Sequence, residues 1–410
     1  MARSLNVFLG RNFVGQLIQD DGGQMLFEYA ESWLEDPDAI SLSRSLPMRN
    51  ERFTQKECRG FFGGILPEED NRKIIARILG ISDKNDFSML EQIGGECAGA
   101  ITFLPAGTKI PEEDDRYRKL GELELAKILR ELPRRPLMAG EDGIRLSLAG
   151  AQDKIAVRLE NGRISIPRGS APSSHILKPA IATFEGIVFN EAFCMALAAE
   201  AGLGAVKTTI ARIEDIDYLL VERYDRNQDE DSQIQRVHQE DFCQALGIPS
   251  EIKYQSEGGP SLVDCFTLLR SASSSPVIDL RSLLDAVIYN LIIGNHDAHA
   301  KNFSLLYLPD HSIRLAPLYD LVSTVFYPEL TDRMAMKIGD KGKSELVFPT
   351  SIEKFARDAG LAVPPTLKRV PTLASRILEA IPKVDKPRKI SEKIAELIGK
   401  RCERFISRFK

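Results

Sequence analysis

Long apolar runs, cysteine-pair motifs and an excess of positive charge are all missing from this sequence of 410 residues. No apolar run approaches the roughly eighteen residues of a membrane-spanning helix. No charged and then apolar leader with a small-residue cleavage site is found either, so we expect a cytoplasmic protein with no membrane partner. The formal net charge of −5 argues against an affinity of the whole chain for nucleic acid, and any such contact is expected to be local.

Cysteine usage argues against two further kinds of site. The six cysteines are scattered without C-x-x-C spacing, and several lie in apolar, helix-like surroundings: Cys58, Cys97, Cys194, Cys243, Cys265 and Cys402. This pattern predicts buried thiols rather than disulfides or zinc ligands. No internal repeat with a period of about 20–50 residues is present, which argues against a solenoid.

The sequence does contain clear changes of hydrophobic period. Short apolar bursts around Gly and Asp-Gly-Gly turns in residues 5–30 predict a small antiparallel sheet, and residues 54–81 have a helical pattern. Another strand is expected within residues 94–107. Residues 1–105 are therefore predicted to form a small α+β subdomain, with a linker and a helix over residues 106–143.

A second unit is expected to begin near residue 144. Residues 144–159 are predicted to be strand, small-residue turn and strand, and residues 190–203 to be an amphipathic helix that packs on this lobe. The β-rich lobe would span residues 144–237, and residues 238–410 are mainly helical in pattern. The sequence thus predicts a bilobal α+β core, with nucleotide in the cleft between its lobes.

The best candidate for a catalytic segment is GNHDAHAKNFSLLYLPDHSIRLAPLYD, residues 294–320. Asp297 and Asn302 lie five residues apart, and Asp320 follows eighteen residues later. Phosphotransfer loops have this order, because the first Asp can deprotonate an attacking hydroxyl while the Asn and the later Asp supply oxygens to Mg²⁺. The D-x4-N pattern alone is weak, since two polar residues that cap a turn would also explain it.

A possible phosphate-binding turn precedes this segment. Ala149, Gly150 and Ala151 form a small-residue turn between two expected strands, with Ser147 and Gln152 beside it. Such a turn lets backbone N–H groups approach phosphates. A single Gly between strands is, however, more often only a hairpin.

Other candidate nucleotide contacts follow in the order that a kinase needs. Lys178, on a later strand, could neutralise phosphates, and Glu191 could pair with it or interact with the helix dipole. The last strand of the β-rich lobe ends at Glu222, Arg223 and Tyr224, whose backbone could bind an adenine edge.

Taken together, these segments closely resemble the HipA family of bacterial serine/threonine-protein kinase toxins. The resemblance lies in SLAGAQDK, HILKP, LVERYDR, QEDFCQALGIPSEIKYQSEGGP, GNHDAHAKNFS and LAPLYDLVST. The N-terminal stretches VFLGRNFVGQL, GFFGGILPEED and GGECAGAITFLP resemble the small domain that precedes the kinase core in this family. The resemblance implies a protein-kinase-like core that uses ATP and Mg²⁺, within a type II toxin–antitoxin module.

The resemblance also implies roles for individual residues. Asp297 would be the catalytic base, with His299 and Lys301 close to phosphate, and Asn302 and Asp320 would bind Mg²⁺. ATP would be bound by Ala149, Gly150, Ala151, Gln152, Lys178, Glu222, Arg223 and Tyr224. Autophosphorylation of Ser147 would switch the enzyme off.

Family resemblance further implies partners: a small helix-turn-helix antitoxin like HipB, operator DNA bound through it, and a protein substrate such as an aminoacyl-tRNA synthetase. Departures from ordinary protein kinases are clear, however. Asn-His-Asp at residues 295–297 replaces His-Arg-Asp, Tyr-Asp-Leu at residues 319–321 replaces Asp-Phe-Gly, and Ala-Pro-Glu is absent. Two alternatives stay open: a small-molecule phosphotransferase, and a non-catalytic co-repressor scaffold for a DNA-binding antitoxin.

Overall fold

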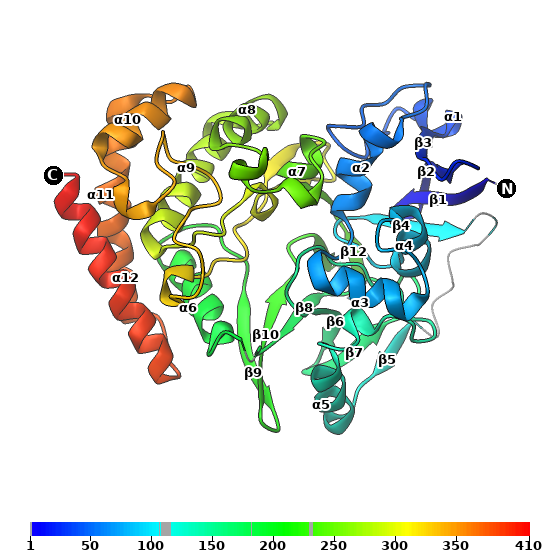
Figure 1. The fold of residues 1–410 in the computed structure, drawn as a ribbon, viewed down its shortest axis with the longest axis horizontal. Coiled ribbons are helices and arrows are strands. Elements are labelled where there is room, and N and C mark those ends of the chain that lie inside the picture. Colours follow the sequence, from blue (N-terminus) through cyan, green and yellow to red (C-terminus); the bar gives the residue numbers. More distant parts are fainter. Residues whose placement is uncertain (1, 106, 108–115, 182, 229–232) are drawn as a thin grey trace. The chain divides into compact units, whose positions relative to one another are not determined.

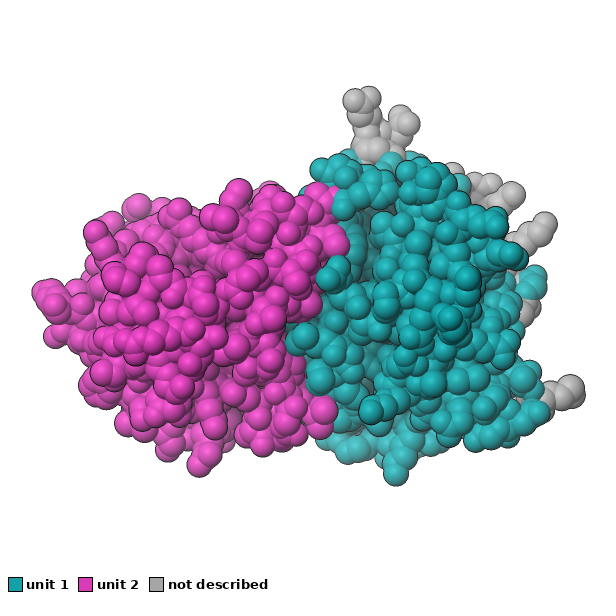
Figure 2. Space-filling view, turned by 90° about the horizontal axis from the view of Figure 1, so that it is seen from above, with its two compact units in different colours: residues 1–179, 211–251, 306–311 teal, residues 180–210, 252–305, 312–410 magenta. Residues whose placement is uncertain are grey.

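The computed structural model describes residues 2–105, 107, 116–181, 183–228 and 233–410. Part of the linker expected over residues 106–143 therefore lies outside the described residues. The chain forms two compact units: residues 1–179, 211–251 and 306–311, and residues 180–210, 252–305 and 312–410 (Figure 2). Among the described helices, none is long and apolar enough to cross a bilayer.

The first unit begins with an antiparallel sheet in the strand order β3-β2-β1-β4 (Figure 1). Its strands are β1 (Arg3–Leu9), β2 (Asn12–Gln19), β3 (Met25–Tyr29) and β4 (Ile101–Pro105). Leu5, Val7 and Leu9 of β1 are buried while the residues between them are not, as expected for a strand with one face on a core. The small sheet predicted over residues 5–30 is thus confirmed.

The first unit also contains short helices. They are α1 (Glu31–Leu34), α2 (Gln55–Gly64), α3 (Glu69–Leu79), α4 (Asp86–Ile93), α5 (Glu122–Glu131) and α7 (Phe242–Ala245). The ring of Phe62 on α2 lies 5.3 Å from that of Phe27 on β3, with Phe53 beside them in the same core. All six cysteines lie within the described part of the chain, where each is buried and none forms a disulfide, which confirms the prediction of buried thiols.

A six-stranded sheet in the order β5-β7-β6-β8-β10-β9 carries several candidate nucleotide residues (Figure 1). Its strands are β5 (Tyr117–Lys119), β6 (Ile155–Glu160), β7 (Arg163–Pro167), β8 (His175–Pro179), β9 (Thr208–Ile213) and β10 (Ile216–Glu222). The hairpin β11 (Arg226–Gln228) and β12 (Ile234–Arg236) follows, and then β13 (His238–Asp241).

The first strand expected within residues 144–159 is wrong. Leu146 makes one isolated bridge with Glu96, and no regular strand forms before β6. The backbone of this segment is hydrogen bonded to Glu96 on both sides of Leu146, because Arg145 accepts from the Glu96 N–H and Ser147 donates to the Glu96 carbonyl. Long-range pairing with a loop thus replaces the local hairpin.

The second unit is mainly helical. It contains α6 (Ile187–Glu200), α8 (Leu262–Ala272), α9 (Pro276–Ile293), α10 (Pro349–Asp358), α11 (Val363–Ala380) and α12 (Lys389–Arg408). Two short strands, β14 (Ser304–Tyr307) and β15 (Ile313–Leu315), lie between α9 and α10 in sequence. Helix α9 starts with Pro276 at its first position, where a missing N–H costs nothing, and its last nine residues are all buried.

Helix α6 belongs to this second unit rather than to the β-rich lobe on which it was expected to pack. Asn190 exchanges hydrogen bonds of 3.1 and 2.9 Å with the backbone of Ser323, and Tyr289 Oη donates to the Cys194 carbonyl at 2.6 Å. The helix also starts earlier than predicted, so Glu191 lies in its second turn. An interaction of Glu191 with the helix dipole is correspondingly weaker.

Candidate active site

The end of α9 fixes the start of the candidate catalytic segment. Gly294 adopts the left-handed conformation, with φ of +74°, and ends the helix. The hydroxyls of Ser323 and Thr324 donate to the carbonyls of Ile293 and Gly294 at 2.6 and 3.0 Å. Helix ends leave such carbonyls without intrahelical partners. These bonds therefore hold the residues that follow the segment against its start.

The side chain of Asn295 connects the loop to α9 and to Asp320. Its Nδ2 donates to Oδ1 of Asn290 at 3.0 Å and to the carbonyl of Asp320 at 3.4 Å. Its Oδ1 accepts a hydrogen bond from the backbone N–H of Asp297 at 3.2 Å. This is an Asx-turn, in which an Asn side chain bonds to the backbone two residues later in the chain. Asn295 is not among the residues predicted for the site, although an Asn two residues before a candidate base is a recognisable signal.

The two residues predicted to bind Mg²⁺ lie together. Asn302 is in a short 3₁₀ helix (Ala300–Asn302), and its Nδ2 is 3.5 Å from Oδ2 of Asp320. The described residues contain no group of three or more His, Cys, Asp and Glu side chains that could hold a metal. Mg²⁺ keeps several waters and commonly takes one or two carboxylates from the protein, so this carboxylate–amide pair suits it.

Asp297, five residues before Asn302, is exposed. Its Oδ1 accepts a hydrogen bond of 2.8 Å from Tyr254 Oη, and its carbonyl accepts one of 2.8 Å from the His299 N–H. The rings of Tyr254 and His299 lie edge to face, 5.5 Å apart. A general base must be reachable by the hydroxyl it deprotonates, and Asp297 is. Tyr254 precedes Asp297 by 43 residues, so no local pattern pointed to it.

His299 and Lys301 are buried. The backbone carbonyl of Lys301 is held by Tyr319, which lies near the end of the segment. Tyr319 Oη donates to the Lys301 carbonyl at 2.8 Å and is 2.7 Å from Oγ of Ser304. The residue that precedes Asp320 therefore positions the residue that precedes Asn302.

His296 takes the place of the Arg in ordinary protein kinases and turns away from the carboxylates. Its Nε2 lies 2.8 Å from Oγ of Ser344, and burial lowers its pKa, so the ring is neutral at neutral pH.

Arg401 of α12 donates to the carbonyls of Leu291 and Ile292, both at 2.8 Å. A buried guanidinium from the C-terminal helix thus caps α9, a contact that the sequence analysis missed.

In the first unit, the candidate phosphate loop is held through its carbonyl groups. Gly150 has φ of +99°, and its carbonyl accepts from the Glu68 N–H at 3.4 Å. Asn71 Nδ2 donates to the carbonyl of Ala151 at 2.8 Å, and Lys154 Nζ donates to that of Ala149 at 2.6 Å. The loop that contains Gln152 is therefore fixed in part by residues of the N-terminal subdomain.

Ser147 is fully buried just before this loop. Its Oγ donates to the Ile65 carbonyl at 3.0 Å, and its N–H donates to the Glu96 carbonyl at 2.9 Å. In this conformation the hydroxyl is not accessible to an attacking reagent.

Lys178 and Glu222 lie on neighbouring strands. Lys178 is on β8 opposite Leu219 of β10, and Glu222 pairs with His175 at the start of β8. Lys178 is buried and Glu222 is exposed. Lys178 and Glu191 belong to different units, so their pairing stays a prediction.

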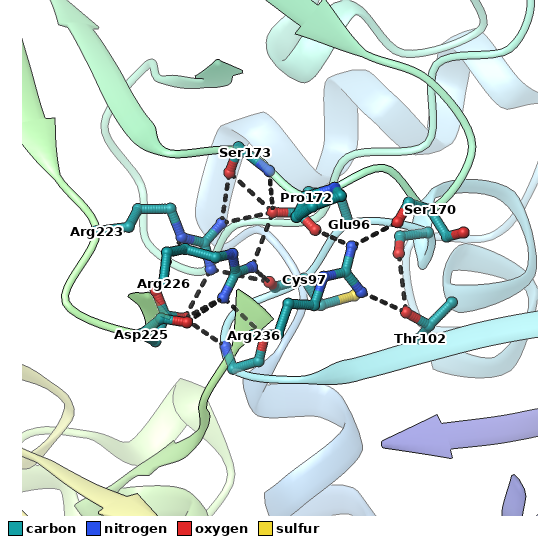
Figure 3. Close-up of polar contacts among 12 residues, drawn as sticks. Glu96, Cys97, Thr102, Ser170, Pro172, Ser173, Arg223, Asp225, Arg226 and Arg236 are labelled. Atoms are coloured by element: carbon teal, nitrogen blue, oxygen red, sulfur yellow. Dashed lines mark hydrogen bonds and ion pairs between the residues drawn. The ribbon is translucent and has the colours of Figure 1, made fainter. Parts of the chain in front are cut away.

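The side chains of Arg223 and Tyr224, which follow Glu222, form hydrogen bonds to other residues of the protein. Arg223 donates to Asp225, Glu96 and Ser173 in a buried cluster (Figure 3). Its N–H donates to the Ser174 carbonyl at 3.0 Å, so an adenine contact would have to use the Arg223 carbonyl. The hydroxyl of Tyr224 donates to Oε1 of Gln239.

Comparisons with known proteins agree along the whole chain. Residues 5–104 match the family described as the HipA N-terminal domain, and residues 146–386 match the HipA-like C-terminal domain. "Putative kinase Y4mE" of Sinorhizobium fredii is 47% identical over 386 residues, which are 93% of this chain and 92% of that protein. "Serine/threonine-protein kinase toxin HipA" of Shewanella oneidensis is 27% identical over 425 residues, covering 98% and 96% of the two chains.

A solved structure is similar over the same extent. A chain of the complex of Shewanella oneidensis HipA, HipB and operator DNA has a TM-score of 0.87 to this chain at 27% identity. The match covers 99% of this chain and 98% of that chain. The bilobal, kinase-like α+β fold predicted from the sequence is thereby confirmed. The chain belongs to the HipA family of serine/threonine-protein kinases.

Proposed function

We propose that this protein is an ATP- and Mg²⁺-dependent protein kinase that acts as the toxin of a toxin–antitoxin module. The observation that carries the proposal is the arrangement of residues 294–320, in which Asp297 is exposed and the side chains of Asn302 and Asp320 lie 3.5 Å apart. Phosphoryl transfer to a hydroxyl depends on positioning and on neutralising charge, and a base with a two-residue Mg²⁺ site supplies both.

In this mechanism Asp297 accepts the proton of a serine or threonine hydroxyl. Tyr254 holds one of its carboxylate oxygens and so fixes the direction of the other. Asn302 and Asp320 hold Mg²⁺, which when bound offsets the negative charge of the phosphates. His299 and Lys301 line the loop close to the transferred phosphate.

The first unit supplies the nucleotide contacts in this proposal. Lys178 binds ATP phosphates together with the backbone of residues 149–152, whose carbonyls are already held in place. Adenine is bound by the backbone of Glu222 and Tyr224 and by the carbonyl of Arg223.

Self-inactivation by phosphorylation of Ser147 follows from the same site. A phosphate adds about −1.5 to −2 charge at pH 7, beside a loop that has to hold the anionic phosphates of ATP. Phosphorylation also removes the hydroxyl proton that the buried Ser147 donates to the Ile65 carbonyl at 3.0 Å. Modification therefore displaces the loop and removes the nucleotide site. Since Ser147 must leave its pocket first, a second molecule phosphorylates it most easily.

The partners we propose are a HipB-like helix-turn-helix antitoxin, operator DNA and a translation component such as an aminoacyl-tRNA synthetase. The similar Shewanella oneidensis protein was solved with HipB and its operator DNA, which supports the first two. With a net charge of −5, this chain alone should bind DNA weakly, because phosphate neutralisation dominates affinity. A gel shift with and without the antitoxin tests this: tight, sequence-specific binding by the chain alone would contradict it.

Labelled ATP with Mg²⁺ distinguishes the proposed activity from its alternatives. We expect label on the protein itself, at Ser147 by mass spectrometry, at a rate per molecule that rises with protein concentration. Ser147→Ala should keep its activity on a protein target but fail to inactivate itself. Label only on added sugars or aminoglycosides would indicate a small-molecule phosphotransferase, and no turnover would indicate a scaffold.

A further inference from the structure

A buried cluster of charged side chains surrounds Glu96 in the first unit (Figure 3). Oε1 of Glu96 accepts hydrogen bonds from the N–H and Oγ of Ser173 at 2.9 and 2.8 Å. The same oxygen forms ion pairs with Arg223 at 3.1 Å and with Arg226 at 2.8 Å. Oε2 pairs with Arg236. One carboxylate thus joins a loop of the N-terminal subdomain to three arginines that follow β10.

The carboxylate is ionised inside the protein. Burial alone would raise the pKa of Glu96, but Arg226, Arg236 and Arg223 lower it to about 2. The Glu96 side chain has 0% exposure and those of the three arginines have 2%, 2% and 7%. Buried ion pairs often add little net stability, because desolvation offsets their attraction. A cluster of this size therefore indicates that its role is to fix the positions of the segments it joins.

The backbone of Glu96 contacts another part of the nucleotide site. Its N–H donates to the Arg145 carbonyl at 2.8 Å, and its carbonyl accepts from the Ser147 N–H at 2.9 Å. Ser147 lies two residues before the phosphate loop, which residues 149–152 form. Glu96 therefore fixes the start of that loop directly.

The three segments bonded to Glu96 each lead to a different proposed ATP contact. Ser147 leads to the phosphate loop, Ser173 precedes Lys178 by five residues, and Arg223 lies between Glu222 and Tyr224. Strand β8, which begins two residues after Ser173, and strand β10, which ends just before Arg223, are also paired with each other. In the described part of the chain, Arg223 is the one proposed ATP-binding residue to which the Glu96 side chain forms an ion pair.

We propose that Glu96 is a positioning residue for ATP, through which the N-terminal subdomain sets the spacing of the phosphate loop, Lys178 and the adenine-binding backbone. The inference rests on the proposed function, because it assumes that these three segments bind ATP. Loss of the Glu96 charge leaves three buried arginines against the single carboxylate of Asp225. Their repulsion shifts Arg223 and Ser173. The proposed ATP contacts on the neighbouring residues are then no longer spaced correctly for the nucleotide.

The test compares ATP binding with turnover in the full chain. Glu96→Gln should raise both the Kd for ATP by calorimetry and the KM for ATP about tenfold or more, because ångström-scale misplacement of a contact has effects of this size. The kcat at saturating ATP should stay within about threefold, since the cluster belongs to the first unit and Asp297 and the metal pair belong to the second. Ser173→Ala removes only the hydroxyl from the cluster and should show a smaller change in the same direction.

Asp285→Asn is a matched control for general destabilisation. Asp285 pairs with Arg369 through two hydrogen bonds of 2.5 and 2.6 Å, and the side chains are 10% and 17% exposed. The control should lower the Tm while leaving the KM for ATP unchanged. If Glu96→Gln does not fold, Ser173→Ala decides: a raised KM supports the proposal. An unchanged KM in the folded cluster variants overturns it.

Failure of the wild-type protein to bind ATP would be a different result. It would overturn the proposed function, and this inference with it.

Discussion

At the scale of single residues, the candidate catalytic loop is held by neutral polar side chains. Asn295, Tyr319, Ser323 and Thr324 bond to backbone groups of the loop or of the helix before it. Such side chains fix the geometry of the loop without adding charge. They therefore do not form ion pairs that would compete with Mg²⁺ or with phosphates at the site. Preorganisation of this kind is what places reacting groups accurately.

Tyr254→Phe should lower kcat with little change in the KM for ATP. The substitution removes the 2.8 Å hydrogen bond to Asp297 and keeps the ring that packs on His299. A hydrogen bond to a charged group contributes about 1.5–3 kcal/mol, which corresponds to a loss of about ten- to 150-fold in kcat. Steady-state kinetics measure it, and an unchanged kcat would show that Tyr254 does not orient the base.

Asp320→Asn should weaken Mg²⁺-ATP binding more than binding of ATP without metal. Asp320 has φ of +58°, and Asn is among the few residues that tolerate this conformation, so the backbone should be preserved. The variant therefore loses charge at the metal rather than local structure. Calorimetry with and without Mg²⁺ measures both affinities; equal losses in the two titrations would assign Asp320 to folding instead.

The order Asp, Asn and Asp within residues 297–320 predicted that Asn302 and Asp320 share a Mg²⁺ site, and their side chains are 3.5 Å apart. The predicted roles of these residues and of Asp297 stay predictions. Tyr254 and Arg401 could not be found from the sequence, because their partners lie 43 and more than 100 residues away. Arg223 had no signal of burial, since a charged residue after a strand is usually exposed and its partner Glu96 is 127 residues distant.

At the scale of elements, the C-terminal end of α9 determines where the catalytic segment begins. A Cβ atom at Gly294 would lie 2.4 Å from Cγ2 of Val325, in addition to the cost of φ +74°. Gly294→Ala should therefore destabilise the fold by about 2–4 kcal/mol, as the sum of backbone strain and overpacking.

Gly80→Ala is the matched control for this substitution. Gly80 also ends a helix at φ of +67°, but nothing lies within 4 Å of a Cβ built there. It should cost only about 1–2 kcal/mol of backbone strain. Urea unfolding measures both variants, and equal losses would mean that the contact with Val325 relaxes freely.

Elements that are determined locally were predictable, and those determined by distant partners were not. The apolar run at the end of α9 and the strands over residues 5–30 form as their periods predict. Residues 144–148 fail as a strand because their backbone pairs with Glu96 in a distant loop. Helix α6 was recognised as a helix, but its period does not say which unit it joins; Ser323 and Tyr289 decide that.

At the scale of the whole molecule, buried ionisable groups give stability a pH dependence with opposing parts. Burial raises the pKa of Glu240 to about 7 despite hydrogen bonds from Ser43, Tyr307 and Arg44. Burial lowers the pKa of His238 to about 4. Glu240 thus favours folding below pH 4.5 and loses that contribution as pH rises through 7. His238 favours folding above pH 6.5 and loses its contribution as pH falls through 4.

Glu240→Gln isolates the first of these contributions, because Gln resembles the protonated carboxyl. Relative to this variant, the wild-type protein should lose about 3 kcal/mol of unfolding free energy between pH 4.5 and 7. The contribution of His238 is common to both proteins and cancels in the difference. Urea unfolding across this pH range measures it; parallel stability curves would show that Glu240 titrates normally.

The central claim is that Asp297 is the catalytic base of phosphoryl transfer, and Asp297→Ala tests it most directly. The carboxylate is exposed, so the variant should keep the wild-type Tm and its affinity for Mg²⁺-ATP. Its phosphorylation rate with labelled ATP should fall about 10²–10⁴-fold, the usual contribution of a positioned base. A folded, ATP-binding Asp297→Ala protein that phosphorylates at nearly the wild-type rate would contradict the account.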